Sequence, residues 1–155
     1  MAALIGYLGM AVGTVGVFFG FFFLGDTALS TTIVSVTTVG VVGILAFVRH
    51  LVFHKSDAKR LGWETDRPDW MFEVGFANLG FGLASVVAAA AQFGVKAEAV
   101  ILLGYALYLL QASMLHGYRY FTEPPRKPAR LWRSCIATLL FAALMLFFAI
   151  KAFVV

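Results

Sequence analysis

The sequence predicts an all-α fold, a bundle of about five transmembrane helices. Two observations lead to this prediction. The chain of 155 residues is 61% hydrophobic and only 13% charged, whereas about a quarter of the residues of a soluble domain are charged. Its apolar residues also gather in five runs, each close to the roughly 20 residues that a helix needs to cross a bilayer. At this length we expect one domain, residues 1–155.

The first predicted span, residues 4–24, contains no charged residue. No basic segment precedes it, which argues against a signal peptide. Its glycines recur at spacings of three and four, and so form a stripe along one helix face: Gly6, Gly9, Gly13, Gly16 and Gly20. Small residues let helix backbones approach closely in lipid. The stripe serves either another helix of the same chain or a contact between subunits, and we expect the subunit contact.

The second predicted span, residues 30–53, is rich in Thr and Ser in its first half. Such hydroxyls can bond to the carbonyl one helical turn back, so lipid tolerates them. His50 lies near the end of this span, and His54 follows one turn later. The next segment, residues 55–69, has charges of both signs and reads as a loop.

The third predicted span, residues 70–93, forms the centre of the predicted bundle. Gly75, Asn78 and Gly82 share a face of small residues, which suits close helix packing. Glu73 lies in the first turns of the same run. An acid at the centre of a span costs about 2.5–3.5 kcal/mol on insertion scales. We therefore expect Glu73 to face protein or water.

The fourth and fifth predicted spans are residues 99–121 and 131–154. The fourth contains Gln111 and His116. Because amides bond between helices in lipid, we expect Gln111 and Asn78 to be interhelical partners. The connection at residues 122–130 holds three prolines among basic residues, and is expected to be a linker, not a helix.

The basic residues predict the orientation in the membrane. Segments 55–69 and 122–130 hold most of the Lys and Arg, and positive loops stay in the cytoplasm. The expected protein is a multi-pass protein of the cytoplasmic (inner) membrane, with a cytoplasmic N-terminus and an external C-terminus. The formal charge of +4 is then a topology signal. It does not indicate a nucleic-acid partner, and membrane lipid is the expected surrounding.

This topology brings four candidate site residues to a similar depth, near the cytoplasmic boundary: His50, His54, Glu73 and His116. The first two are four residues apart and can point at one atom. Such a cluster can bind a transition metal or haem, or relay protons. The alternative is that these side chains simply lie in the polar headgroup layer. The single Cys135 cannot form a cysteine-rich metal site.

Two segments resemble a group of small, uncharacterised bacterial membrane proteins. They are residues 72–83, with the sequence Phe-Glu-Val-Gly-Phe-Ala-Asn-Leu-Gly-Phe-Gly-Leu, and residues 104–117, which end in His-Gly. The resemblance covers about a third of the chain. It implies a bacterial inner-membrane protein, and no functional residue follows from it.

The sequence favours a small membrane protein that assembles as a homo-oligomer or as a subunit of a larger membrane complex. Its expected role is transport or support of a partner. The alternative is a metal- or haem-binding redox subunit that uses the His/Glu cluster. An enzyme with a soluble substrate is least favoured, because no recognised catalytic or nucleotide-binding motif is present.

Overall fold

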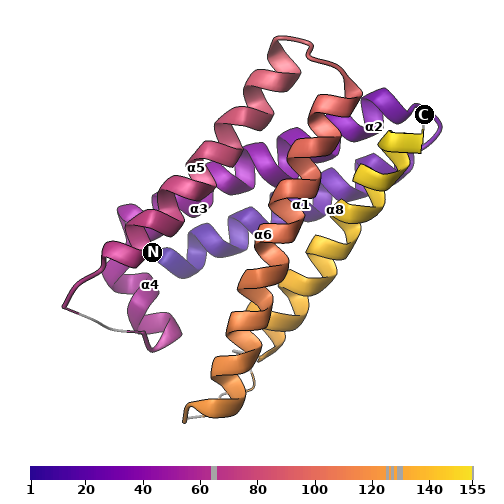
Figure 1. Cartoon of the computed structure of the whole chain (residues 1–155). Coiled ribbons are helices and arrows are strands. Elements are labelled where there is room, and N and C mark those ends of the chain that lie inside the picture. The colour runs from indigo at the N-terminus through magenta and orange to yellow at the C-terminus, as the bar shows by residue number, and fades with distance from the viewer. Residues whose placement is uncertain (64–65, 125, 127, 129–130, 155) are drawn as a thin grey trace.

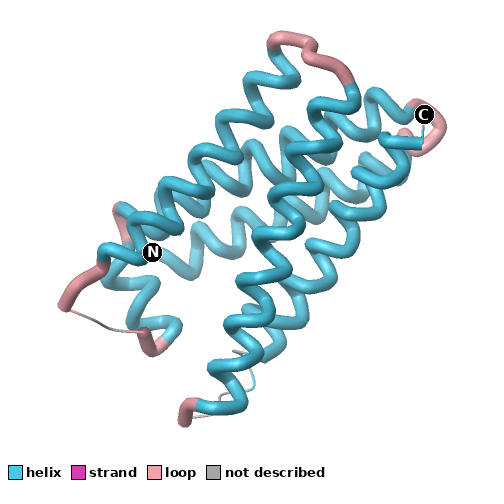
Figure 2. The backbone as a smooth tube through the Cα atoms, viewed as in Figure 1, coloured by secondary structure: helices cyan, strands magenta, loops and turns pink. Residues whose placement is uncertain are grey.

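The computed structural model describes residues 1–63, 66–124, 126, 128 and 131–154, and over these residues it contains helices and turns but no strand. Figure 1 shows the helices side by side in one bundle, and Figure 2 shows how short the connections between most of them are. The all-α prediction is confirmed. Five helical stretches are long and apolar enough to cross a membrane, so the chain is described as a multi-pass membrane protein.

The spans follow the predicted runs with shifts of a few residues at their ends. The second span is one continuous run in which a π-helical segment, η1, separates α2 from α3, and the fifth begins with a second π-helical segment, η2. The elements are α1 (Ala2–Phe22), α2 (Thr27–Val34), η1 (Ser35–Val41), α3 (Val42–Leu51), α4 (His54–Leu61), α5 (Asp69–Ala90), α6 (Val95–Thr122), η2 (Leu131–Ile136) and α8 (Ala137–Val154).

Helix α4 corrects the prediction of a loop at residues 55–69. It has one buried face, formed by Asp57, Ala58 and Leu61, and it ends where Gly62 takes a left-handed conformation with φ 69°. Glycine is favoured at such a helix end because it has no Cβ to clash. The mixed charges of this segment were typical of a loop, and the segment nevertheless forms a short helix. The buried face of this helix includes the Asp57 carboxylate.

The glycine stripe of α1 packs largely within the chain. A Cβ at Gly16 would lie 1.8 Å from Thr37 Oγ1, and one at Gly20 would lie 2.3 Å from Val34. Gly13 lies in the same way against Phe141 of α8. Contacts inside one protomer therefore account for this part of the stripe. Assembly with other subunits stays a prediction that needs another surface.

Helices α3 and α5 also pack through glycines. A Cβ at Gly43 would lie 2.7 Å from the Asn78 carbonyl oxygen, and one at Gly82 would lie 3.0 Å from the Gly40 oxygen. Ser35 and Ser85 join the same two spans by a buried hydrogen bond of 2.9 Å. This close approach fixes α5 against the second span and so fixes where its polar side chains lie.

The bundle is not equally tight along its length. A buried apolar cluster that includes Val34, Leu102, Met145 and Phe148 joins α2, α6 and α8 near the C-terminal end of α8. In Figure 1, α5 and α6 lie near each other at the turn that joins them and diverge toward their other ends. The N-terminus, α4 and the end of α6 lie toward that diverging end. A cavity occupies the space between these elements.

Candidate functional site

A partly open cavity of about 840 Å³ lies between the spans, and α1, α3, α4, α5, α6, η2 and α8 all contribute to its walls. Sites for small molecules commonly have volumes of about 300–1,000 Å³. Much of the wall is apolar, including Met10, Val42, Phe141 and Leu144. Gly9 borders it as well, and a Cβ there would meet no atom within 4 Å. The cavity is therefore large enough for an organic molecule with an apolar part.

The cavity wall is strongly basic. Its lining includes Arg49, Arg60, Arg119 and Arg133, and among the residues that the structure describes no Asp or Glu lines it. These arginines lie on α3, α4, α6 and η2, in the parts of these elements that lie toward the diverging end of the bundle. The cavity thus has mostly apolar walls and guanidinium groups at one end. These groups can bind an anion inside a membrane protein.

Asp57 is the carboxylate that organises two of these arginines from behind the wall. Its side chain is fully buried, and its Oδ1 accepts hydrogen bonds from Arg60 Nε at 2.9 Å and Arg60 Nη2 at 2.7 Å. Its Oδ2 lies 3.4 Å from Arg49 Nε and 3.1 Å from His50 Nδ1. Burial by itself raises the pKa of Asp57. The contact with His50 and the charges of Arg49 and Arg60 outweigh burial and hold this pKa well below its usual value.

Both ring nitrogens of His50 lie close to charged side chains. Its Nε2 lies 3.0 Å from Arg49 Nη2. A guanidinium can only donate, so Nε2 must accept. The proton of the neutral ring is then on Nδ1, which faces Asp57. His50 consequently has no nitrogen lone pair left for a metal.

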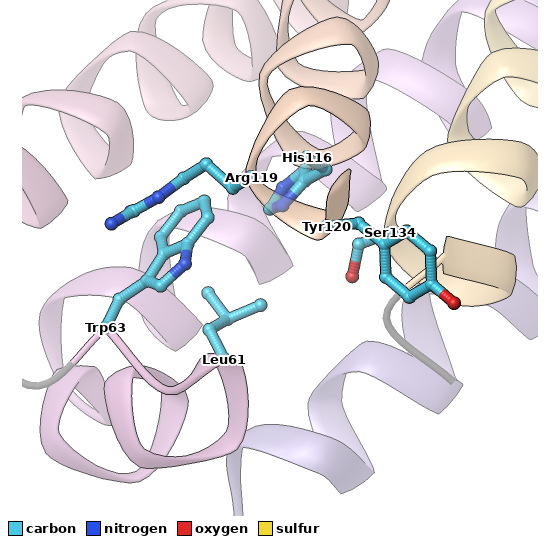
Figure 3. A pocket seen from close by; sticks show the side chains of 6 residues that line it. All are labelled: Leu61, Trp63, His116, Arg119, Tyr120 and Ser134. Atoms are coloured by element: carbon cyan, nitrogen blue, oxygen red, sulfur yellow. The ribbon is translucent and has the colours of Figure 1, made fainter. Parts of the chain in front are cut away.

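Trp63 connects the segment after α4 to α6. Its ring stacks on His116, with centroids 4.9 Å apart, and the guanidinium of Arg119 lies 4.4 Å from its centroid. Figure 3 shows Trp63, His116 and Arg119 around a small pocket that Leu61, Tyr120 and Ser134 complete. Its volume of about 10 Å³ is near the space of one water molecule. These contacts hold Arg119 at the cavity wall.

A hydrogen-bonded chain lies deeper, between α5 and α6. Asn78 Nδ2 donates to the Val74 carbonyl at 2.7 Å, which fixes the orientation of the amide. Asn78 Oδ1 then accepts from the Tyr105 hydroxyl at 2.7 Å, and Nδ2 also donates to the Tyr108 oxygen at 3.0 Å. Within the described part of the chain, no acceptor is found for the Tyr108 proton. Since Tyr108 lines the cavity, it can donate to whatever lies there.

The structure does not gather the four residues that the sequence placed at one site. His54 Nδ1 donates to the Leu51 carbonyl at 2.9 Å, and its ring packs edge-on against Phe72. Glu73 is exposed and does not line the cavity. No three His, Cys, Asp or Glu side chains among the described residues come together as metal ligands would. His50 and His116 do line the cavity.

The predicted polar and packing residues have distinct places. Asn78 bonds between helices, whereas Gln111 is an exposed residue of the cavity wall. Gly75 lies against His50 of the second span. Gly6 and Gly9 line the cavity.

Sequence reasoning missed the residues that form most of the polar wall. Asp57 stands three residues before Arg60, a spacing that pairs charges on one helix face. The cavity is also lined from one face of α6 by residues at successive spacings of three, four and seven, namely Tyr105, Tyr108, Ala112 and Arg119. Both patterns were visible, although neither is specific for a binding site.

Comparison with known proteins places the chain in a family without assigning it an activity. No curated protein matches the sequence, and no solved structure matches the fold. A family model does match residues 26–152, which include four of the five candidate spans and nearly all of the polar cavity wall. The chain therefore belongs to DUF6790, a family of unknown function.

Proposed function

We propose that this multi-pass membrane protein binds a small amphipathic molecule in its central cavity, as a transporter or as an accessory subunit that presents the molecule to a partner. The observation that supports this proposal is the cavity of about 840 Å³, to which all five spans contribute. An apolar chamber with a few converging polar groups is the usual form of a ligand site.

The polar groups of the wall favour binding over simple packing. Tyr108 presents a hydroxyl proton that no described residue accepts. Tyr108 is partly buried, and a molecule or water in the cavity that accepts this proton adds a hydrogen bond that the protein alone does not supply.

The proposed setting is the inner membrane, with the basic end of the bundle in the cytoplasm. The cavity then receives its ligand from the cytoplasmic side or from the inner leaflet. Lys55 places a positive charge at the start of α4, and basic residues also lie at the end of α6. Such positive charge is typical of the cytoplasmic side of a membrane protein. This orientation is part of the proposal.

The redox alternative has less support. A haem or metal site built from His50, His54, Glu73 and His116 would need at least two of these side chains to converge with free nitrogen or oxygen atoms. His50 Nε2 accepts from Arg49 and its Nδ1 faces Asp57, and Glu73 lies outside the cavity lining. The geometry therefore favours a binding cavity.

A cavity-filling substitution tests the proposal. Gly9→Leu adds a side chain where a Cβ meets no atom within 4 Å, and should fill the cavity without disrupting packing at that Cβ. Native mass spectrometry of protein released from mild detergent should show small-molecule or lipid adducts on the wild type. The adducts should fall at least fivefold in Gly9→Leu.

Gly80→Leu is the matched control. Gly80 also has open space around it but does not line the cavity. Its adducts should stay at the wild-type level. A wild type that carries no adduct, or equal loss in both variants, would contradict the proposal.

A further inference from the structure

We propose that the ligand of the cavity carries a phosphate-type headgroup that Arg119 and Arg133 hold at the basic end. This inference rests on the proposed function and adds the chemical class of the ligand. The shared chemistry is a phosphate monoester attached to an apolar chain. A membrane lipid and a soluble organic phosphate can both supply it.

The first argument is the balance of charge. Four arginines line the cavity, and two carboxylates pair with them: Asp57 with Arg49 and Arg60, and Glu123 with Arg119. Among the residues that the structure describes, two positive charges therefore remain in excess at this end of the cavity when the histidines are neutral. A phosphate monoester carries about −1.5 to −2 at neutral pH. Its charge therefore matches the excess better than a single carboxylate does.

The second argument concerns which arginines have N–H groups available for an anionic ligand. Asp57 occupies the Nε–Nη2 edge of Arg60, and Arg49 lies between Asp57 and His50. Arg119 uses only Nε for Glu123, at 2.8 Å, in a partly exposed pair. Exposed pairs of this kind contribute little, about 0–1 kcal/mol, so an anionic ligand can compete for Arg119.

Arg133 is the second available group. Its guanidinium lies 4.6 Å from the centroid of the Tyr7 ring, and no carboxylate pairs with it in the described part of the chain. Aromatic rings orient a guanidinium while leaving its N–H groups free, as Trp63 does for Arg119. Two oriented guanidinium groups with free donors suit the several oxygens of a phosphate.

The third argument concerns the rest of the ligand. Arg119 is eleven residues beyond Tyr108 on α6, which corresponds to about 16 Å along the helix axis. The wall between them includes Ala112 and Leu115 of α6 and faces Phe141 and Leu144 of α8. An apolar chain extending inward from the headgroup meets mostly hydrocarbon there. This favours an amphiphile over a free ion.

The test measures lipid retention by native mass spectrometry in a neutral detergent. Phosphatidic acid has a phosphate monoester, phosphatidylglycerol a singly charged diester, and phosphatidylcholine no net charge. Each is added separately at the same concentration. The wild type should retain phosphatidic acid at least tenfold more strongly than phosphatidylcholine, with phosphatidylglycerol between them. Equal retention of all three, with the cavity still occupied, would overturn the headgroup assignment while leaving the proposed function intact.

Variants locate the headgroup. Arg119→Gln together with Arg133→Gln should reduce the affinity for phosphatidic acid at least tenfold and leave phosphatidylcholine unchanged. Arg126→Gln is the matched control, because Arg126 is exposed and lies outside the cavity lining. If the double variant does not elute as folded protein, Arg133→Gln alone should still show a threefold loss. Wild-type affinity in a folded Arg119/Arg133 variant would overturn the proposal.

A competition experiment separates the two sources of the phosphate. Inorganic phosphate and a short-chain alkyl phosphate are added at millimolar concentration to protein loaded with phosphatidic acid. Displacement by the alkyl phosphate would indicate a soluble organic phosphate, and resistance to both would indicate a lipid. Displacement by inorganic phosphate alone would contradict the need for an apolar chain. Failure of Gly9→Leu to release any adduct would instead count against the proposed function.

Discussion

At the residue scale, Asp57 brings three charged or titratable side chains together. It is fully buried, and its carboxylate contacts Arg49, His50 and Arg60. Without it, two guanidinium groups would face each other across the end of α3 with no counter-charge. It therefore allows a basic wall to form while the helix that carries it stays packed.

Asp57→Asn should destabilise the protein by roughly 2 kcal/mol. Removing one partner of a buried ion pair costs about 3–5 kcal/mol, and the partial exposure of both arginines, 26% each, reduces that figure. Thermal unfolding in mild detergent measures the change. Asp69→Asn is the control, because its pair with Arg67 is exposed, and it should shift stability by less than about 1 kcal/mol. Equal losses of stability in the two variants would show that Asp57 stabilises the fold no more than an exposed carboxylate does.

The pH dependence of the same interaction follows from the lowered pKa of Asp57. A carboxylate whose folded pKa is depressed contributes stability above its unfolded pKa, here near 3.8. That contribution is lost as pH falls below this value toward the folded pKa. The stability difference between wild type and Asp57→Asn should thus stay constant from pH 5 to pH 8 and shrink below about pH 4. A difference that already shrinks near pH 6 would contradict the assignment.

His50 illustrates which features of single residues could be predicted from the sequence. Its i, i+4 spacing from His54 drew attention to the correct end of the second span. Its partner, however, is a carboxylate on the next short helix, and not a shared metal. Spacing within one helix says which residues share a face. It does not say which side chain of another element packs against that face.

At the element scale, the positions of the spans could be predicted because membrane thickness sets their length. Each apolar run that the sequence shows corresponds to a helix in the structure. Helix α4 could not be predicted in the same way, since it is short, highly charged and stabilised by burial of Leu61 and by the ion pairs of Asp57. The π-helical segments η1 and η2 also left no clear signal. The divergence of the helices that forms the cavity depends on packing between elements far apart in sequence.

The glycines of α1 provide a test at this scale. Gly16→Ala should destabilise the protein by about 1–3 kcal/mol, because its Cβ would lie 1.8 Å from Thr37 Oγ1. Thr37 has little freedom to move, since its hydroxyl donates to the Ile33 carbonyl at 2.6 Å and its Cβ is branched. Thermal unfolding and native mass are measured together.

The control for this substitution is Gly80→Ala, where nothing lies within 4 Å of the new Cβ. It should leave stability unchanged or slightly raised. Lower stability of Gly16→Ala with an unchanged oligomeric mass would place the stripe inside the protomer. A changed oligomeric mass with unchanged stability would instead indicate that the glycine stripe lies at a contact between subunits.

At the scale of the whole molecule, the bundle combines a tight apolar end with an open basic end. The core around Leu102 and Phe148 holds one end together. At the other, Asp57 and the Trp63 stack hold separate helices at the cavity wall. This asymmetry makes orientation in the membrane decisive, because it determines the side from which a ligand reaches the arginines.

Cysteine labelling of intact cells tests that orientation. In a Cys135→Ala background, Ser56→Cys places a thiol on the exposed face of α4, and Lys96→Cys places one near the start of α6 at the opposite end. A membrane-impermeant maleimide should label position 96 and leave position 56 unlabelled until the cells are opened. The reason is the excess of Lys and Arg in segments 55–69 and 122–130, which favours the cytoplasmic side. Labelling of position 56 in intact cells would reverse the topology, and the cavity would then take up its ligand from outside.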